Sequence, residues 1–198
     1  MSFKSTYLAG AVGAGDTDHY CASQNLKVGD LTLTATLTPG NGARIVTCTR
    51  AVDQAADTPG TLLVTGKNLA GQTITETLIP GANGILVSGS KLFASVSKVT
   101  AAGWEIAGNN DTIIVGMGAE HFVSESAGTL KGILITVAAA SAINVTDGAE
   151  TIMILPASMA IGYYEFDVAY GSLRVEPQGA TTISVIHSPS LPTTYAMS

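Results

Sequence analysis

The segment TLKGILITVAAASAINVTDG, residues 129–148, decides whether this chain carries a membrane helix or a pair of strands. A helix that spans a bilayer needs about 20 consecutive apolar residues with few or no charges. Here Lys131 lies near the start and Asp147 near the end, and between them the bulky residues alternate with smaller ones. Alternation of β-branched residues is typical of a strand with one buried face. We therefore predict two short strands joined by a compact bend within residues 138–142, and no membrane anchor.

The composition also indicates strands. With 198 residues the chain is long enough for one large or two small domains, and its core needs no disulfide or metal. Charged residues make up 12% of the chain, against about 25% in ordinary soluble domains. Glycine and threonine, which suit turns and strands, are abundant. We predict an all-β protein whose charge-poor surface suits burial in an assembly, although some folds are simply poor in charge.

Net charge and cysteines limit the environment of the protein. A net charge of −6 and a pI of about 4.8 repel phosphate backbones, so we expect no direct nucleic-acid binding. Cys21 and Cys48 are too few for a disulfide framework, and buried free thiols are favoured over a single bridge. The apolar segment at residues 8–14 is too short and too rich in glycine for a secretory signal, which predicts synthesis in the cytoplasm.

Short strands are predicted along most of the chain. DLTLTATLT, residues 30–38, alternates apolar residues with threonine and reads as a half-buried strand. Residues 61–79 read as a hairpin whose loop lies at 67–71. The other predicted strands are 43–52, 85–87, 93–99, 112–118, 130–137, 141–146, 150–155, 162–168, 172–175 and 181–187.

The predicted fold class is all-β, with two β-sandwich or jelly-roll-like domains and an extended N-terminal arm. The polar segment AEHFVSESAG, residues 119–128, marks the boundary between the domains. We assign residues 1–24 to an arm that crosses to a neighbouring subunit. The domains follow at 25–122 and 123–190, an irregular tail covers 191–198, and no strict internal repeat is visible.

The densest polar cluster is DTDHYC, with Asp16, Asp18, His19 and Cys21. Carboxylate, imidazole and thiolate groups this close could hold zinc, but structural zinc takes four ligands and the next histidine is distant. A polar loop whose cysteine packs inward is the favoured interpretation. GAVGAG, residues 10–15, lacks the strand and helix of a dinucleotide site and reads as a flexible arm.

The remaining candidates are weaker. His19, His121 and His187 are isolated from nucleophiles in sequence, and Glu120-His121 reads as a solvated or interface pair. Asn109-Asn110-Asp111 lacks the glycine and distal glutamate of a calcium loop and reads as a turn. Aromatic residues that could stack on sugars or bases are more readily explained by core packing; these are Trp104, Tyr163, Tyr164 and Phe166. We therefore predict no catalytic, cofactor-binding or metal site and no enzyme activity.

Two segments resemble small structural proteins of tailed bacteriophages. The first is LLVTGKNLAGQTITETLIPGANGILVSGSKLFASVSKVT, residues 62–100, with a V-T-G strand, an A-G-Q turn, an x-I-T-E-T strand and a V-x-G-x-K-x-F-x-x-V run. The second is GTLKGILITVAAASAINVTDG, residues 128–148, followed by GYYEFDVAYGSLRV, residues 162–175. Together they cover roughly two-thirds of the chain. Residues 1–60 match no such pattern, and Ser172 stands where the pattern has another loop residue.

This resemblance implies a virion protein that decorates or cements a capsid. Its implied partners are the major capsid protein and further copies of itself, as a trimer on the virion surface. In this pattern residues 129–148 form the first hairpin of the C-terminal module. Two other functions stay open: a tail, neck or fibre component, and a carbohydrate-binding module, for which the Tyr163-Tyr164 pair would be responsible.

Overall fold

The computed structural model describes residues 4–8, 15–25, 29–38, 42–53, 58–105, 111–118, 121–124, 126–138, 140–148, 150–177 and 182–189. Within these residues every regular element is a strand, so the predicted all-β class is confirmed. The strands are β1 (Lys4–Leu8), β2 (Asp16–Asn25), β3 (Gly29–Asp30), β4 (Arg44–Ala51), β5 (Thr61–Lys67), β6 (Thr73–Leu78), β7 (Leu86–Phe93), β8 (Ser95–Ala102), β9 (Thr112–Met117), β10 (His121–Ser124), β11 (Gly128–Val137), β12 (Ile143–Asp147), β13 (Glu150–Leu155), β14 (Gly162–Tyr170), β15 (Leu173–Pro177) and β16 (Thr182–Pro189).

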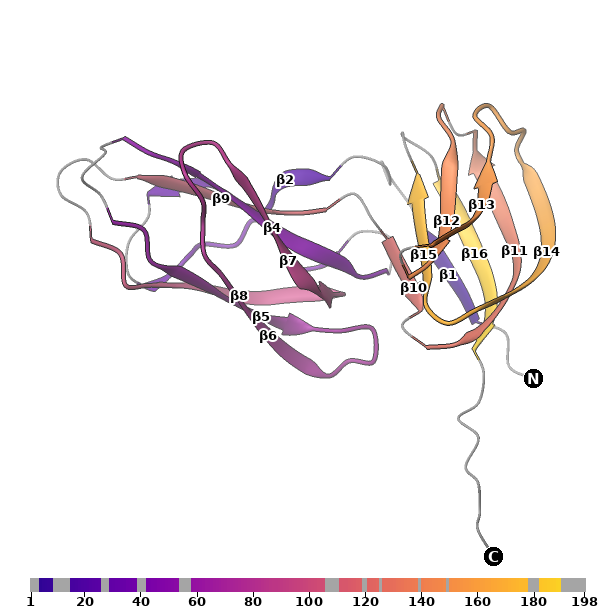
Figure 1. Ribbon diagram of the computed structural model, residues 1–198, viewed down its shortest axis with the longest axis horizontal. Coiled ribbons are helices and arrows are strands. Elements are labelled where there is room, and N and C mark those ends of the chain that lie inside the picture. Colours follow the sequence, from indigo (N-terminus) through magenta and orange to yellow (C-terminus); the bar gives the residue numbers. More distant parts are fainter. Residues whose placement is uncertain are drawn as a thin grey trace, which may run out of the picture.

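Strands β2–β9 form the first sandwich, which Figure 1 shows on the left. Its two sheets have the orders β2-β9-β4-β7 and β3-β8-β5-β6, and all pairs are antiparallel. Inward-facing residues of both sheets meet in one apolar core that includes Phe93, Trp104 and Val115. This arrangement follows from the two-residue period, which gives each strand one apolar face.

The second sandwich contains β1 and β10–β16. Its sheets have the orders β1-β16-β11-β14 and β10-β15-β12-β13, again with antiparallel pairs throughout. A separate core lies between them and includes Leu130, Ile133, Val145 and Val185. Each sandwich therefore buries its own apolar residues.

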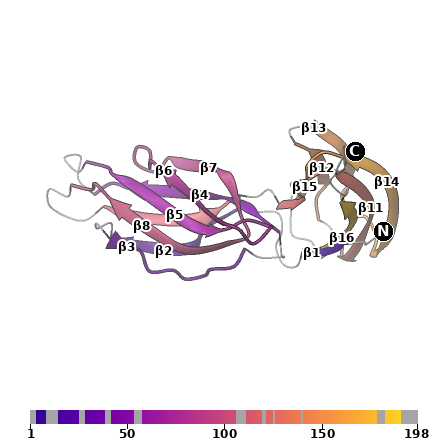
Figure 2. The same ribbon diagram turned by 90° about the horizontal axis from the view of Figure 1, so that it is seen from below.

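The N-terminal segment differs from the predicted arm. Lys4–Leu8 form β1, which pairs with β16 at the edge of the second sandwich, whereas Asp16–Asn25 form β2, which pairs with β9 in the first. Figure 2 shows β1 beside β16 and apart from β2. The arm prediction is wrong for these residues, because backbone pairing with sheet edges holds them although they lack a regular apolar period. The predicted boundary at 122/123 falls inside β10, and the tail at 191–198 lies outside the described residues.

Residues 129–148 do form two strands, β11 and β12, but they are not a hairpin. β11 pairs with β14 and β16, whereas β12 pairs with β13 and β15 in the opposite sheet. Both strands turn apolar residues toward the same core, so the connection carries the chain across the sandwich. No helix within the described residues is long and apolar enough to cross a membrane.

The segment 30–38 is less regular than predicted. Only Gly29–Asp30 form a strand, β3, and the following residues run beside β8 through single backbone bonds. Leu31 donates its N–H to Val99 at 2.9 Å, and Val96 donates to Thr36 at 2.8 Å. The apolar alternation holds at Leu31, which is buried, but Leu37 is exposed.

The two sandwiches have the same topology. When β2 is matched with β1, and β3–β9 are matched in order with β10–β16, every pair of neighbouring strands in one sandwich has a counterpart in the other. The first sandwich is thus inserted between the first and second strands of the second. The sequence carries a trace of this repeat, because β9 begins TIIVGM (112–117) and β16 begins TISVIH (182–187). The central valines, Val115 and Val185, occupy equivalent register positions.

Candidate interaction surface

The residues of the polar cluster DTDHYC, for which a metal site was the less favoured interpretation, are not placed around a common ligand position. They lie at the start of a strand, β2, rather than in a loop. His19 Nδ1 faces Asp16 Oδ2 at 3.3 Å, and its Nε2 lies 3.0 Å from the Leu37 carbonyl oxygen. Cys21 points into the core as expected, and burial raises its pKa to about 12. Across the described residues no group of three or more His, Cys, Asp or Glu side chains is placed to hold a metal.

Both cysteines are buried free thiols. Cys21 and Cys48 are register partners of the same residue, Val115, from opposite sides of β9. Neighbouring strands lie about 4.8 Å apart, so two spacings separate the cysteines by roughly 10 Å. This separation exceeds the reach of a disulfide, and the expectation of free thiols is confirmed.

The predicted turn at 109–111 ends in a buried ion pair. Residues 109–110 lie outside the described part of the chain. Asp111 is buried, and its Oδ2 accepts a hydrogen bond from Arg50 Nε at 2.5 Å. Its Oδ1 accepts the N–H of Asp53 at 3.0 Å, and the guanidinium of Arg50 lies 5.8 Å from the centre of the Trp104 ring. These contacts engage both oxygens of the Asp111 carboxylate within the fold. They explain its buried position without a calcium ion.

In the second sandwich a buried polar pair, Tyr170 and His187, occupies positions that hold apolar residues in the first sandwich. His187 Nδ1 lies 2.7 Å from the Tyr170 hydroxyl, and both residues are buried. Their counterparts in the first sandwich are Met117 and Phe93. Burial raises the pKa of Tyr170, and a hydrogen bond with Ser124 opposes this rise. Because both rings face the core, this pair is closed to substrates.

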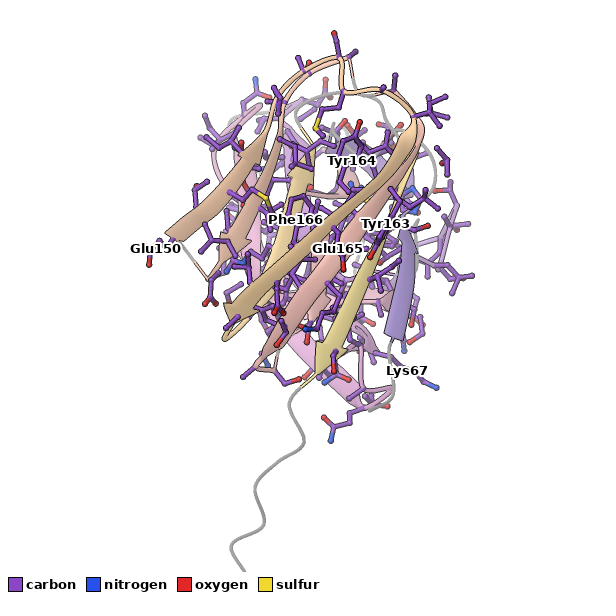
Figure 3. The ribbon with its side chains drawn as sticks, turned by 90° about the vertical axis from the view of Figure 1, so that its right-hand side faces the viewer. Lys67, Glu150, Tyr163, Tyr164, Glu165 and Phe166 are labelled. Carbon is purple, nitrogen blue, oxygen red and sulfur yellow. The ribbon has the colours of Figure 1, made fainter. Side chains whose placement is uncertain are left out.

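The other candidates divide between core and surface. Glu120 lies outside the described residues, as does the side chain of His121. Tyr164 and Phe166 pack against the second core, as predicted. Tyr163 does not: it is 52% exposed on the outer face of its sheet, on the same side as Glu165 (Figure 3). Its ring lies over Gly132, where a side chain would collide with it.

The phage-like pattern of residues 62–100 is explained by packing between its own parts. Gly66, the glycine of V-T-G, has no room for a Cβ because the carbonyl of Ser95 and the ring of Phe93 lie against it. Glu76, the glutamate of x-I-T-E-T, accepts hydrogen bonds from the backbone of the edge strand β7. A Cβ at Gly89 would collide with this carboxylate. These residues therefore specify the sandwich rather than a ligand site.

The second segment of the pattern also contains a carboxylate that accepts hydrogen bonds from the backbone. The carboxylate of Asp147 accepts the N–H groups of Gly171 at 2.8 Å and Ser172 at 2.7 Å. These bonds hold the link between β14 and β15, and they lower the pKa of Asp147. Ser172 takes part through its backbone, so the departure from the pattern at this position does not disturb the contact.

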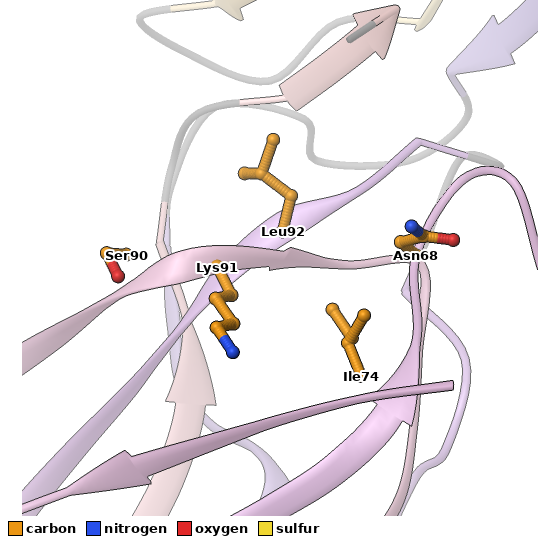
Figure 4. Close-up of a pocket in the computed structure, with 5 residues that line it drawn as sticks. All are labelled: Asn68, Ile74, Ser90, Lys91 and Leu92. Atoms are coloured by element: carbon orange, nitrogen blue, oxygen red, sulfur yellow. The ribbon is translucent and has the colours of Figure 1, made fainter. Parts of the chain in front are cut away.

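A shallow groove of about 290 Å³ lies between the β5–β6 hairpin and β7 (Figure 4). It is lined by Asn68, Ile74, Ser90, Lys91 and Leu92. Its polar groups already have partners, since Lys91 Nζ donates to the Thr75 carbonyl at 2.6 Å and Asn68 bonds the turn residue Gln72. The groove therefore offers little to anchor a small ligand.

Exposed aliphatic side chains are the feature that the fold does not explain. Nine large apolar side chains in the described part of the chain are exposed: Leu37, Leu63, Ile79, Ile85, Leu86, Val137, Ile154, Ile161 and Tyr163. Most belong to segments without a charged residue, which are 77–90, 132–146 and 151–164. The exposed residue Asp53 borders the first of these segments. Its neighbour Val52 donates its N–H to Asn83 Oδ1 at 3.0 Å. This surface is suited to contacts with protein.

Sequence reasoning missed this surface because an apolar residue beside a turn reads equally well as the start of a buried strand. The signal that could have revealed it is the length of the uncharged runs, which exceeds what single strands need.

No protein-family model matches the chain, and a comparison with curated proteins found no significant match.

Proposed function

We propose that this chain is a non-enzymatic structural protein of a tailed-bacteriophage particle, which binds the capsid lattice and stabilises it as a decoration or cement protein. Its partner is the major capsid protein, and it acts on the virion surface as a homo-oligomer, a trimer in the simplest case. The proposal starts from the resemblance of residues 62–100, 128–148 and 162–175 to phage structural proteins.

The observation that carries the proposal is the combination of a charge-poor chain with large apolar side chains exposed on two sandwiches. A free monomer ordinarily covers such residues or surrounds them with charge. Three titratable side chains that sequence analysis singled out are engaged in contacts within the fold, namely His19, Asp111 and His187. A surface of this kind favours a protein partner over a substrate.

Stabilisation of a lattice follows from mass action. A subunit that binds only the assembled shell lowers the free energy of that state, by an amount that grows with its concentration relative to its Kd. Several weak apolar contacts are sufficient when the subunit is oligomeric, because each bound contact raises the effective concentration of the next. No single polar residue then has to dominate binding.

The exposed ring of Tyr163 supports a second candidate, a carbohydrate-binding module. One face of the ring covers Gly132, and the carboxylates of Glu165 and Asp167 lie on the same exposed side of β14. Aromatic faces beside carboxylates suit sugar rings. A glycan array without binding, together with unchanged particle binding by Tyr163→Ala, would exclude this candidate.

The deciding experiment is the copy number of the protein in purified particles, measured by quantitative mass spectrometry against the major shell protein. Decoration predicts a ratio comparable to that of the shell protein. A handful of copies would instead assign the chain to the tail, neck or fibre. Complete absence from particles would refute the virion proposal.

A further inference from the structure

Asn83 and Gly84 form a turn at the surface of the first sandwich, between β6 and β7. Both residues are exposed, and the Ala82 carbonyl accepts the N–H of Ile85 at 3.0 Å across the turn. Gly84 has a φ of 73°, whereas Asn83 stays outside the left-handed region. This combination defines a type II turn, which favours glycine at its third position.

An asparagine followed by glycine is chemically unstable when the backbone is free to move. The glycine nitrogen loses its proton and attacks Cγ of the asparagine, and the side-chain nitrogen leaves with a proton as ammonia. The product is a cyclic succinimide. Water then adds to one of the two ring carbonyl carbons and breaks its bond to nitrogen, which leaves aspartate or isoaspartate. Glycine permits this reaction best because it has no side chain and the widest range of backbone conformations.

The fold holds both reacting groups of this pair. Gly84 donates its N–H to the Arg50 carbonyl at 2.8 Å, so the attacking nitrogen is engaged with β4. Asn83 Oδ1 accepts the N–H of Val52 at 3.0 Å, so the side-chain amide that would be attacked is fixed as well.

The turn adds a third restraint on the reaction. Ring closure requires the Gly84 nitrogen to eclipse Cβ of Asn83. The second residue of a type II turn has a ψ of about +120°, which directs the following nitrogen away from Cβ. The reaction therefore requires the turn to open and its bonds to β4 to break.

Refolding would not reverse the reaction. Isoaspartate lengthens the main chain by one atom, which shifts the Gly84 N–H away from the Arg50 carbonyl. Aspartate keeps the length of the main chain but places a carboxylate in residues 77–90, which contain no charged side chain. Because the exposed residues Ile85 and Leu86 follow directly, either product changes the uncharged surface described above.

We propose that Asn83-Gly84 is a hydrolytic self-modification site, which the hydrogen bonds to Arg50 and Val52 keep latent in the folded protein. Opening of the turn, or unfolding of the first sandwich, releases the site and converts the asparagine to aspartate or isoaspartate. The modification then records that a chain has left its native state. This inference is independent of the proposed function, since it uses only the turn and its bonds to β4.

The test compares the full-length protein under native conditions with the same protein unfolded in urea, at one pH and temperature. Peptide mapping by mass spectrometry measures the rate of conversion at Asn83. Asn83→Gln identifies the signal, because its longer side chain closes the corresponding ring much more slowly. Hydrogen exchange of the Gly84 N–H measures how often the turn opens. Val52→Pro removes the N–H that holds Asn83 Oδ1, and the fluorescence of Trp104 checks that this variant is folded.

Conversion in the folded protein should be about 10- to 100-fold slower than in urea, because two hydrogen bonds of ordinary strength must open first. Exchange of the Gly84 N–H should be slowed by a similar factor, since the same opening frees it. Folded Val52→Pro should convert about 3- to 10-fold faster than the folded wild type.

Equal rates of conversion in the folded and unfolded wild type would overturn the inference. Slow conversion together with unprotected exchange at Gly84 would overturn it as well, because the protection would not come from this turn. A wild-type rate in folded Val52→Pro would have the same consequence. Where Val52→Pro does not fold, the agreement or disagreement between conversion and exchange in the wild type decides the question.

Discussion

The contact between Glu76 and Gly89 permits a test of whether the phage-like pattern is a packing device. The Glu76 carboxylate accepts the N–H of Ser90 at 2.6 Å, its hydroxyl at 2.9 Å and the N–H of Lys91 at 3.2 Å. Hydrogen bonds to charged groups contribute about 1.5–3 kcal/mol when buried, and less at a half-exposed site such as this one. We expect Glu76→Ala to lower the free energy of unfolding by about 1–2 kcal/mol.

Gly89→Ala should destabilise the protein through the same contact. The added Cβ would collide with the carboxylate and displace it from its donors, at a similar cost of about 1–2 kcal/mol. When Glu76 is already alanine, this collision disappears, and alanine is preferred over glycine in a strand by roughly 0.5–1 kcal/mol. The double variant should therefore be no less stable than Glu76→Ala, which gives a coupling energy of about 1–2 kcal/mol.

The assay is urea unfolding followed by the fluorescence of Trp104, the single tryptophan, which reports on the core of the first sandwich. Gly71→Ala is the control, because Gly71 has a φ of 76° and open space around its Cβ position. Its cost is backbone strain, which does not involve Glu76 and should add to the cost of Glu76→Ala. Additivity of Gly89→Ala and Glu76→Ala within about 0.5 kcal/mol would refute the reasoning.

Three further predictions follow from buried or bonded groups. Asp111→Ala should destabilise the first sandwich by about 3–5 kcal/mol in the same fluorescence assay, because it leaves a buried arginine without its carboxylate; a loss below 1 kcal/mol would contradict this. Asp147 has a lowered pKa, so its contribution to stability is present above its ordinary value of about 3.8 and is lost as pH falls through the lowered value. The unfolding midpoint, followed by circular dichroism, should therefore fall less between pH 6 and about pH 2 for Asp147→Asn than for the wild type. Equal falls in the two proteins would argue against a stabilising role for the hydrogen bonds to the Asp147 carboxylate. Burial raises the pKa of Cys21 to about 12 and of Cys48 to about 11. Neither should react with a thiol reagent at pH 8 until urea unfolds the chain, and rapid reaction of the folded protein would show that the thiols are accessible.

Much of the strand pattern could be predicted because each strand of a sandwich carries its own two-residue period. All six strands expected between residues 130 and 187 are present, and the hairpin at 61–79 has its turn where it was expected. The strands that were missed, β1, β2 and β10, lack that period. They are held by pairing with a sheet edge, which depends on backbone geometry rather than on side-chain alternation.

The candidate surface was less accessible to sequence reasoning. Ile85 was assigned to a strand, and Ile161 fell between a predicted turn and the predicted strand 162–168, because an apolar residue next to a proline-containing loop looks the same whether it is buried or exposed. The equivalence of the exposed residues Leu86 and Tyr163 depends on the repeated topology, which sequence similarity alone did not reveal apart from the short match between β9 and β16.

The sequence by itself determined the all-β class, the position of most strands and the absence of a membrane helix at residues 129–148, since these depend on local alternation and on charges within single segments. Only the tertiary structure decided which strands pair. It places β11 and β12 in opposite sheets and repeats one topology in both sandwiches. It also pairs Lys4–Leu8 with β16, the last strand of the chain. Strand pairing is decided by burial of apolar faces against residues distant in sequence, and the local pattern is compatible with many such pairings.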